Sequence, residues 1–224
     1  MIKKILKKII AHFKKPIESF FFDIRKIQWF FAKIYLTKIQ KIYFPKTSFL
    51  IDIDYIDLLN LWKNILKRKP KVILEVGSGY STFLILAAIK KLNSLNINVV
   101  EKFYSLEQNK HYLINLKKKI DKTSLNKVTF LLTKLKILKI HNTNVSICTN
   151  FPKEKINFFY EDRADDPKFN IAGDALKIES KMPEDYFICV DGMTPTVKFY
   201  KKYLKRKYKF SGGIFSGSNF EPYN

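Results

Sequence analysis

The chain contains little cysteine, histidine and glycine: two Cys, three His and seven Gly in 224 residues. Cys148 and Cys189 each lie within an apolar run rather than in paired ligand spacing. The sequence therefore favours neither a disulfide framework nor a zinc site, and it points to a reducing, cytoplasmic compartment. His12, His111 and His141 share no common spacing. We therefore assign no histidine to a metal or to catalysis and expect no metal site.

Long apolar runs are also missing. No segment reaches the ~18 consecutive apolar residues that suggest a membrane-spanning helix. The N-terminus shows no small-residue cleavage site after an uninterrupted apolar core, so we expect neither a span nor a secretory signal. The length suits one α/β domain with an appendage. With 46% hydrophobic residues, the composition is not that of a disordered chain.

Acidic residues are few relative to basic ones, 20 Asp and Glu against 42 Lys and Arg, which gives a net charge of +22. Such a charge attracts anionic partners such as nucleic acid, acidic glycans or an anionic membrane face, without choosing among them. The charge is concentrated in residues 1–48, which hold twelve Lys and Arg and two acids.

Residues 1–48 also carry the pattern of two amphipathic helices. Apolar residues recur at helical spacing over residues 2–13, and a second, longer stripe continues to Pro45. One interpretation is that these helices pack on the domain that follows or on a second subunit of a homo-oligomer. The other is a peripheral anchor at an anionic inner membrane face, with snorkelling lysines. We expect a basic helical extension at 1–48 and one main domain at 49–224.

The main domain alternates strand and helix patterns after a first helix at 54–67. This alternation predicts an α/β fold with a Rossmann-like, seven-stranded, mostly parallel sheet and helices on both faces. A terminal hairpin at 208–223 supplies an antiparallel pair. The expected strands are 72–76, 98–106, 128–133, 145–148, 156–160 and 186–190, and the expected helices are 81–92, 109–120, 173–181 and about 195–206.

The clearest motif is a buried strand followed by a glycine turn and a helix start, with the sequence VILEVGSGYST. Gly77 and Gly79 permit tight turning and close approach of a ligand, and the helix offers free N–H groups. Ser81 or Thr82 can cap that helix. Thr82 stands where a dinucleotide-binding fingerprint has its third glycine, which argues against a nicotinamide cofactor.

Two acids accompany this turn. Glu75 lies just before it, where a carboxylate can receive an ammonium group directly or through water. Glu107 ends the next strand in the segment YSLEQ, where a carboxylate suits the hydroxyls of a ribose. Together these features predict a site for a nucleoside cofactor.

The segments LEVGSGYST and YSLEQ resemble the first two cofactor motifs of class I S-adenosylmethionine-dependent methyltransferases, and the resemblance covers residues 70–224. It implies S-adenosylmethionine as the cofactor, with Glu107 on the ribose. Near the methionine end of the cofactor, the resemblance implies Glu75, Gly77, Ser78 and Gly79. We add Ser81 and Thr82, at the start of the following helix, to the expected cofactor-binding residues.

A third region is the segment NFFYEDR, a strand that delivers Glu161 and Asp162 to the ligand side of the sheet. We take them as candidate catalytic residues, either as a general base for a substrate hydroxyl or as a metal-binding carboxylate, against the alternative of a solvated loop. The resemblance places Asp162 nearest the transferred methyl group, although Arg163 stands where the family has a small residue. Asp191, in a DG pair after the next strand, is a candidate substrate-binding residue or a turn residue.

These features favour a methyltransferase that acts on a small-molecule or glycan acceptor. One alternative is an RNA methyltransferase, because residues 198–209 combine lysines with tyrosines that could stack on bases. A second alternative is a non-catalytic protein of a membrane surface or assembly that keeps a methyltransferase-like fold.

Overall fold

The structure is a computed structural model, and it describes residues 24–45, 54–163, 171–192, 194–213 and 216–223. Its main feature is a seven-stranded sheet with the strand order β3-β2-β1-β6-β7-β9-β8. The first five strands in this order are parallel, and β9 and β8 are antiparallel to their neighbours. The seven strands are β1 (Val72–Val76), β2 (Lys102–Glu107), β3 (Thr129–Leu132), β6 (Phe158–Glu161), β7 (Phe187–Val190), β8 (Tyr208–Gly213) and β9 (Ser216–Pro222).

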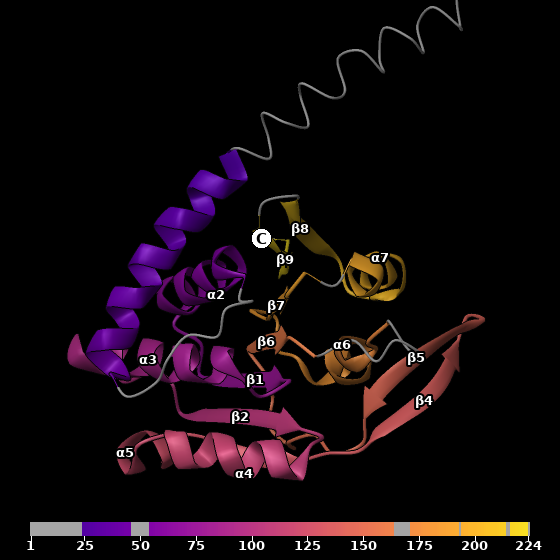
Figure 1. Ribbon diagram of the computed structural model, residues 1–224. Coiled ribbons are helices and arrows are strands. Elements are labelled where there is room, and N and C mark those ends of the chain that lie inside the picture. The colour runs from indigo at the N-terminus through magenta and orange to yellow at the C-terminus, as the bar shows by residue number, and fades with distance from the viewer. Residues whose placement is uncertain (1–23, 46–53, 164–170, 193, 214–215, 224) are drawn as a thin grey trace, which may run out of the picture.

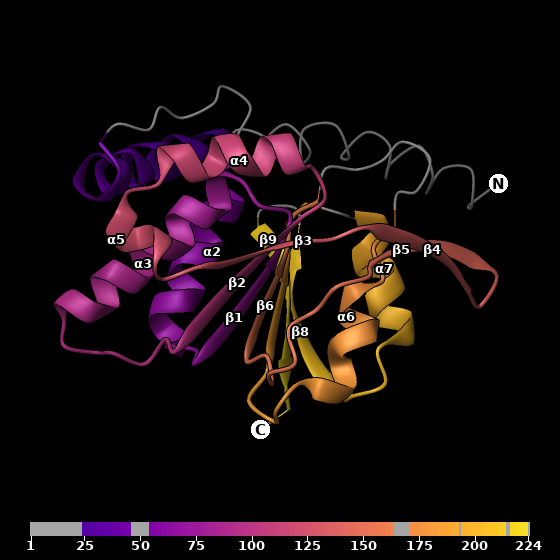
Figure 2. The same ribbon diagram turned by 90° about the horizontal axis from the view of Figure 1, so that it is seen from below.

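Helices cover both faces of this sheet, as Figures 1 and 2 show. One face carries α2, α3 and α4 together with the helix at 24–43, and the other carries α6 and α7. The predicted α/β, Rossmann-like fold class and the terminal antiparallel pair are therefore confirmed. The helices are α2 (Tyr55–Arg68), α3 (Tyr80–Ser94), α4 (Lys110–Lys119), α5 (Lys122–Leu125), α6 (Asp174–Ile178), the 3₁₀ turn η1 (Glu179–Lys181) and α7 (Thr194–Tyr203).

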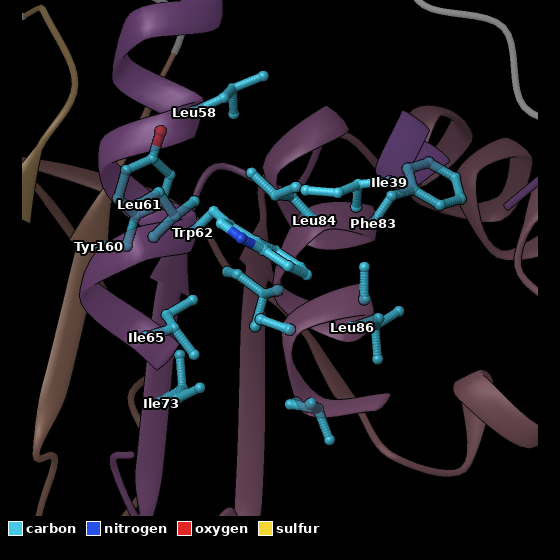
Figure 3. Close-up of a cluster of buried hydrophobic side chains, with 14 of the residues drawn as sticks. Ile39, Leu58, Leu61, Trp62, Ile65, Ile73, Phe83, Leu84, Leu86 and Tyr160 are labelled. Atoms are coloured by element: carbon cyan, nitrogen blue, oxygen red, sulfur yellow. The ribbon is translucent and has the colours of Figure 1, made fainter. Parts of the chain in front are cut away.

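The core on the first face is built from apolar stripes of α2 and α3 against the sheet (Figure 3). Leu61 and Ile65 of α2 are fully buried beside Ile73 of β1. Asp54 caps α2 by accepting from the backbone N–H groups of Ile56 and Asp57. The cap and the buried stripe together fix α2 across the strands, with the N-terminal end of α2 near the site described below.

The helix at 24–43 shares this core. Ala32 and Leu36 are completely buried and Ile39 nearly so, while the opposite side of the helix is exposed. The described part of the predicted extension therefore packs on the main domain, and residues 1–23, where the first amphipathic helix is expected, lie outside the described residues. Within the part of the chain that the structure describes, no helix is both long and apolar enough to span a bilayer.

The predicted strand at 145–148 does not join the main sheet, which corrects the expected placement. It is part of β5 (Thr143–Cys148), which pairs with β4 (Leu135–Ile140) in an antiparallel hairpin and forms one isolated parallel bridge, from Ser146 to Ala172. Val145 and Ile147 are buried in the core that α6 and α7 form on the other face of the sheet. The sequence pattern missed β4 because its LKILKI segment has little buried surface.

Candidate active site

A pocket of about 370 Å³ opens where β1, β2 and β6 end. These strands are neighbours in the parallel sheet, and the chain leaves all three at the same edge. Open α/β sheets bind their ligands at this carboxyl edge, and the volume lies in the ~300–1,000 Å³ range of small-molecule sites. Val76, Gly77, Ser78, Leu106, Glu107, Gln108, Asn109, Tyr112, Thr133, Leu135, Cys148, Asp162 and Arg163 line it.

Gly77 forms the tight turn at the floor of this pocket. Its φ is +94°, and a Cβ placed on it would lie 1.8 Å from the carbonyl oxygen of Asp162. Its N–H donates to the carbonyl of Leu106 at 3.0 Å, and the Asp162 N–H donates to Val76 at 2.9 Å. A side chain at position 77 is therefore excluded by both conformation and space. Gly79 differs, because a Cβ there would meet only the Tyr112 hydroxyl, at 3.6 Å.

Glu75 lies behind the pocket wall and is fully buried. Its carboxylate accepts from the hydroxyls of Ser81 at 2.6 Å, Thr82 at 2.7 Å and Ser105 at 2.5 Å. Burial raises the pKa of Glu75 to about 8, against the lowering effect of these hydroxyls. Ser105 also contacts the Ser78 hydroxyl at 2.6 Å. Glu75 thus fixes the first turn of α3 from within the core. The Ser105 hydroxyl connects it to Ser78, which lines the pocket.

Glu107 stands on the pocket wall at the end of β2. It is 8% exposed, and its Oε1 accepts from the backbone N–H of Asn109 at 2.7 Å. Asn109 in turn caps α4 by accepting from the Tyr112 N–H at 3.0 Å. The second Glu107 oxygen has no partner within the described residues, and the wall therefore offers an acceptor to a ligand.

The predicted cofactor residues thus fall into two groups. Gly77, Ser78 and Glu107 line the pocket. Glu75, Ser81 and Thr82 form the hydrogen-bonded support behind it, and Thr82 accepts from the Gly79 N–H at 2.9 Å. Gly79 itself is the N-cap residue of α3. All seven positions therefore belong to one strand–turn–helix unit and the neighbouring strand end, and their role in cofactor binding stays a prediction.

A cluster of three carboxyl groups lies on the β6 and β7 side of the pocket. Asp162 follows β6, Asp191 follows β7, and Asp57 comes from the first turn of α2. Burial raises the pKa of Asp162, and a hydrogen bond with Asp191 lowers it. Burial, followed by a hydrogen bond with Asp57, raises the pKa of Asp191 to about 11. At neutral pH the coupled acids therefore keep a proton between them.

Tyr160 of β6 adds a hydroxyl to this cluster. The side chain is fully buried, and its hydroxyl interacts with the Asp162 carboxyl group and lowers the pKa of that group. After burial, the charges of Asp162 and Asp191 are the largest causes that raise its pKa. Within the described part of the chain, no group of three or more His, Cys, Asp and Glu residues has the geometry to hold a metal ion.

Glu161 does not face the pocket, contrary to its assignment as a candidate catalytic residue. Successive side chains of a strand point to opposite faces, and Glu161 is fully buried on the α6 and α7 side. It accepts from the Tyr200 hydroxyl and lies 3.5 Å from the Arg163 Nε. Arg163 also pairs with Asp174 at 3.1 Å and donates to the Ser146 carbonyl at 3.0 Å. Arg163 thus ties the β5 segment to the end of β6.

A second hollow, of about 520 Å³, lies on the far side of the acid cluster. Asp57 and Gly192 line it, and a Cβ on Gly192 would lie 3.8 Å from the Asp57 carboxylate. Lys198 and Lys201 of α7 border it as well. The acid cluster therefore lies between a cofactor-sized pocket and a second hollow of mixed polarity.

Sequence reasoning missed Asp57 and Tyr112. The sequence predicts that Asp57 lies in the helix at 54–67 and gives it no role in the site, yet it is only 7% exposed. The available signal was its position four residues before Leu61, on the buried face of α2. Tyr112 carries no comparable signal, because its place on the pocket wall depends on how α4 packs.

No protein-family model and no curated protein sequence matches this chain. Solved structures do match it. The chain is similar to the SAH-bound methyltransferase PaMTH1 of Podospora anserina, with 11% identity and a TM-score of 0.53 over 90% of this chain and 88% of that chain. At such low identity, the likeness concerns the fold: the chain has the fold of a methyltransferase.

Two further structures are similar with lower scores. One is precorrin-6y C5,15-methyltransferase of Geobacter metallireducens, with 11% identity and a TM-score of 0.48 over 79% of this chain and 93% of that chain. The other is an O-methyltransferase of Bacillus cereus in complex with SAH, with 13% identity and a TM-score of 0.45 over 85% and 90% of the two chains.

Proposed function

We propose that this protein is an S-adenosylmethionine-dependent methyltransferase that acts on a small-molecule or glycan acceptor. The observation that carries the proposal is the pocket at the carboxyl ends of β1, β2 and β6. It has the Gly77 turn as its floor, Glu107 on one wall and Asp162 on the other. The SAH bound to the Podospora anserina methyltransferase supports the choice of cofactor.

The pocket residues suit the parts of this cofactor. Glu107 has one carboxylate oxygen with no partner among the described residues, which could accept from ribose hydroxyls. The Gly77 turn leaves backbone close to the ligand, since a Cβ at that position is excluded. Ser78 can present its hydroxyl to the methionine end, supported by the Ser105 and Glu75 network beneath it. When bound, S-adenosylmethionine would supply an electrophilic methyl group.

Asp162 is the residue we propose as the general base. Its carboxylate would accept the proton of an acceptor hydroxyl, so that the hydroxyl oxygen becomes nucleophilic toward the methyl group that a bound S-adenosylmethionine would supply. Burial raises the pKa of Asp162, which brings a carboxylate closer to the range where it acts as a base near neutral pH. Asp191 shares a hydrogen bond with Asp162 and would orient its carboxylate.

The packing of α7 favours a small acceptor over RNA. Tyr200 is fully buried and donates to Glu161. Tyr203 stacks on His141 at 4.5 Å between ring centroids, and Tyr208 packs edge-on against Phe220. The tyrosines that would stack on bases are thus engaged within the protein. The second hollow beside the acid cluster, of about 520 Å³, has room for a small polar molecule or a sugar unit.

The test is calorimetric binding of S-adenosylmethionine and S-adenosylhomocysteine to the full chain. We expect micromolar affinity, and we expect it to be lost in Glu107→Ala and Gly79→Val. Gly79→Val is chosen because a Cβ has room there, so the fold should persist while the branched side chain narrows the approach to the pocket. Glu101→Ala is the matched control, since it removes an exposed acid before the other end of β2.

A folded wild-type protein that binds neither compound would refute the proposal and favour a non-catalytic role for the fold. Equal loss of binding in Glu101→Ala would show that Glu107→Ala weakens binding through the loss of one negative charge, rather than through a contact in the pocket.

A further inference from the structure

The helix at 24–43 carries large apolar side chains on its outward side. We call this set the exposed stripe: Ile27 (56% exposed), Phe30 (56%), Phe31 (65%), Ile34 (42%), Tyr35 (47%) and Ile42 (70%). The first five form a continuous patch, since positions three and four apart are neighbours on a helix, and Ile42 lies two turns beyond Tyr35 on the same side. Patches of this kind mark interaction sites in soluble proteins.

The helix cannot turn this stripe inward. Its opposite side is fixed in the core by Ala32, Leu36 and Ile39. An ordinary surface helix has one apolar face and one polar face, whereas this helix is apolar on both. Among the residues that the structure describes, none covers this stripe, which leaves it available to a partner.

Charge around the stripe selects the partner. Residues 24–43 contain five Lys and Arg and no acid. Lys26, Lys33 and Lys41 are exposed along one border, and Lys38 lies within the stripe. Across a groove of about 770 Å³, α2 adds Lys63. A second copy would bring the same cations and the same net charge of +22, which opposes pairing of two such faces. An anionic surface complements them.

The stripe also lies near the proposed acceptor side. Arg25, at the start of the described helix, lines the second hollow together with Asp57. It also borders a small apolar hollow formed with Trp29 and Phe30. A surface that receives the stripe would therefore be close to the acid cluster.

We propose that the exposed stripe binds the anionic face of a lipid bilayer. The aromatic and aliphatic side chains enter the boundary between headgroups and acyl chains, and the bordering lysines contact lipid phosphates. The helix lies in the plane of the membrane, with its other side still packed on the core. This inference does not depend on the proposed methyltransferase activity.

The experiment is flotation of the full chain with vesicles of phosphatidylcholine alone or with about one third phosphatidylglycerol. We expect binding to the anionic vesicles. The double variant Phe30→Ser, Phe31→Ser should lower the partition coefficient by about tenfold or more, because two largely exposed aromatic rings no longer enter the bilayer. Lys38→Gln, Lys41→Gln should reduce the preference for anionic over neutral vesicles.

The matched control is Leu95→Ser, Ile114→Ser, which removes two exposed apolar side chains outside the stripe (52% and 42% exposed). It should bind vesicles as the wild type does, and thermal unfolding should show that each variant is folded. Unchanged flotation of the Phe30→Ser, Phe31→Ser variant would overturn the proposal, because residues 1–23 or charge alone would then account for binding. A wild type that ignores vesicles but sediments as a dimer, with the dimer lost in that variant, would identify a subunit interface instead.

Discussion

Glu75→Gln should make the protein more stable than the wild type at alkaline pH. Glu75 is fully buried, and its carboxylate is surrounded by the hydroxyls of Ser81, Thr82 and Ser105. Burial raises its pKa from 4.5 to about 8. Glutamine has almost the same shape and is neutral at every pH, and the three hydroxyls can rotate to serve its amide group.

The magnitude follows from linkage between folding and ionisation. The folded-state pKa is the higher one, so the stability associated with Glu75 is fully present below the unfolded value and is lost as the pH rises through about 8. Each pKa unit corresponds to about 1.4 kcal/mol. Between about pH 5 and about pH 9 the wild type should therefore lose roughly 4 kcal/mol relative to the variant.

The assay is urea unfolding of both proteins across this pH range. At each pH the unfolding free energy of the variant is subtracted from that of the wild type. Subtraction removes the contributions of Asp162 and Asp191, which titrate in both proteins. A difference in unfolding free energy that stays constant with pH would refute the reasoning. It would mean that the hydroxyls stabilise the carboxylate enough to cancel the cost of burial.

Three further predictions concern the pocket and its support. Gly77→Ala should destabilise the protein by about 3 kcal/mol or more in urea unfolding, whereas Gly79→Ala should cost about 1 kcal/mol or less, because only position 77 combines a positive φ with a backbone clash. Asp162→Asn should lower transfer of a labelled methyl group to hydroxyl acceptors by about 10²–10⁴-fold while calorimetry shows cofactor affinity retained; an unchanged rate would remove Asp162 as the base. Arg163→Met should cost about 3–5 kcal/mol in urea unfolding, because Glu161 and Asp174 would stay buried without their cation; a variant as stable as the wild type would contradict this role of Arg163.

The order of elements was predictable because the core strands are buried on both faces. Strands such as VILEV and FICV are continuous apolar runs bounded by turns, as expected in a parallel sheet covered by helices. Strand β2 begins four residues later than predicted, at Lys102. The apolar residues before it, Val99 and Val100, pack against the first core without joining the sheet. The local sequence pattern does not distinguish apolar residues within a strand from apolar residues that pack on the core just before it.

The candidate site was predictable where it depends on the turn between β1 and α3. The glycine pair and the acids at two strand ends are local features, and the parallel sheet brings them to one edge. Asp57 was not predictable in this way, because it reaches the acid cluster through the packing of α2. The strand at 145–148 was predicted, but its place outside the main sheet was not, because the position of the β4–β5 hairpin depends on contacts with α6 and on the Arg163 bridge to Ser146.

Three acids at the carboxyl edge of this sheet show how strand geometry separates roles. Glu75, within β1, points toward α3 and is held by hydroxyls with a raised pKa. Glu161, the last residue of β6, points to the opposite face and is balanced by Arg163. Asp162, one position later, has left the strand and reaches the pocket wall. A shift of one residue thus separates a structural carboxylate from a candidate base, so Asp162→Asn should affect methyl transfer, whereas Glu161→Gln should act through stability.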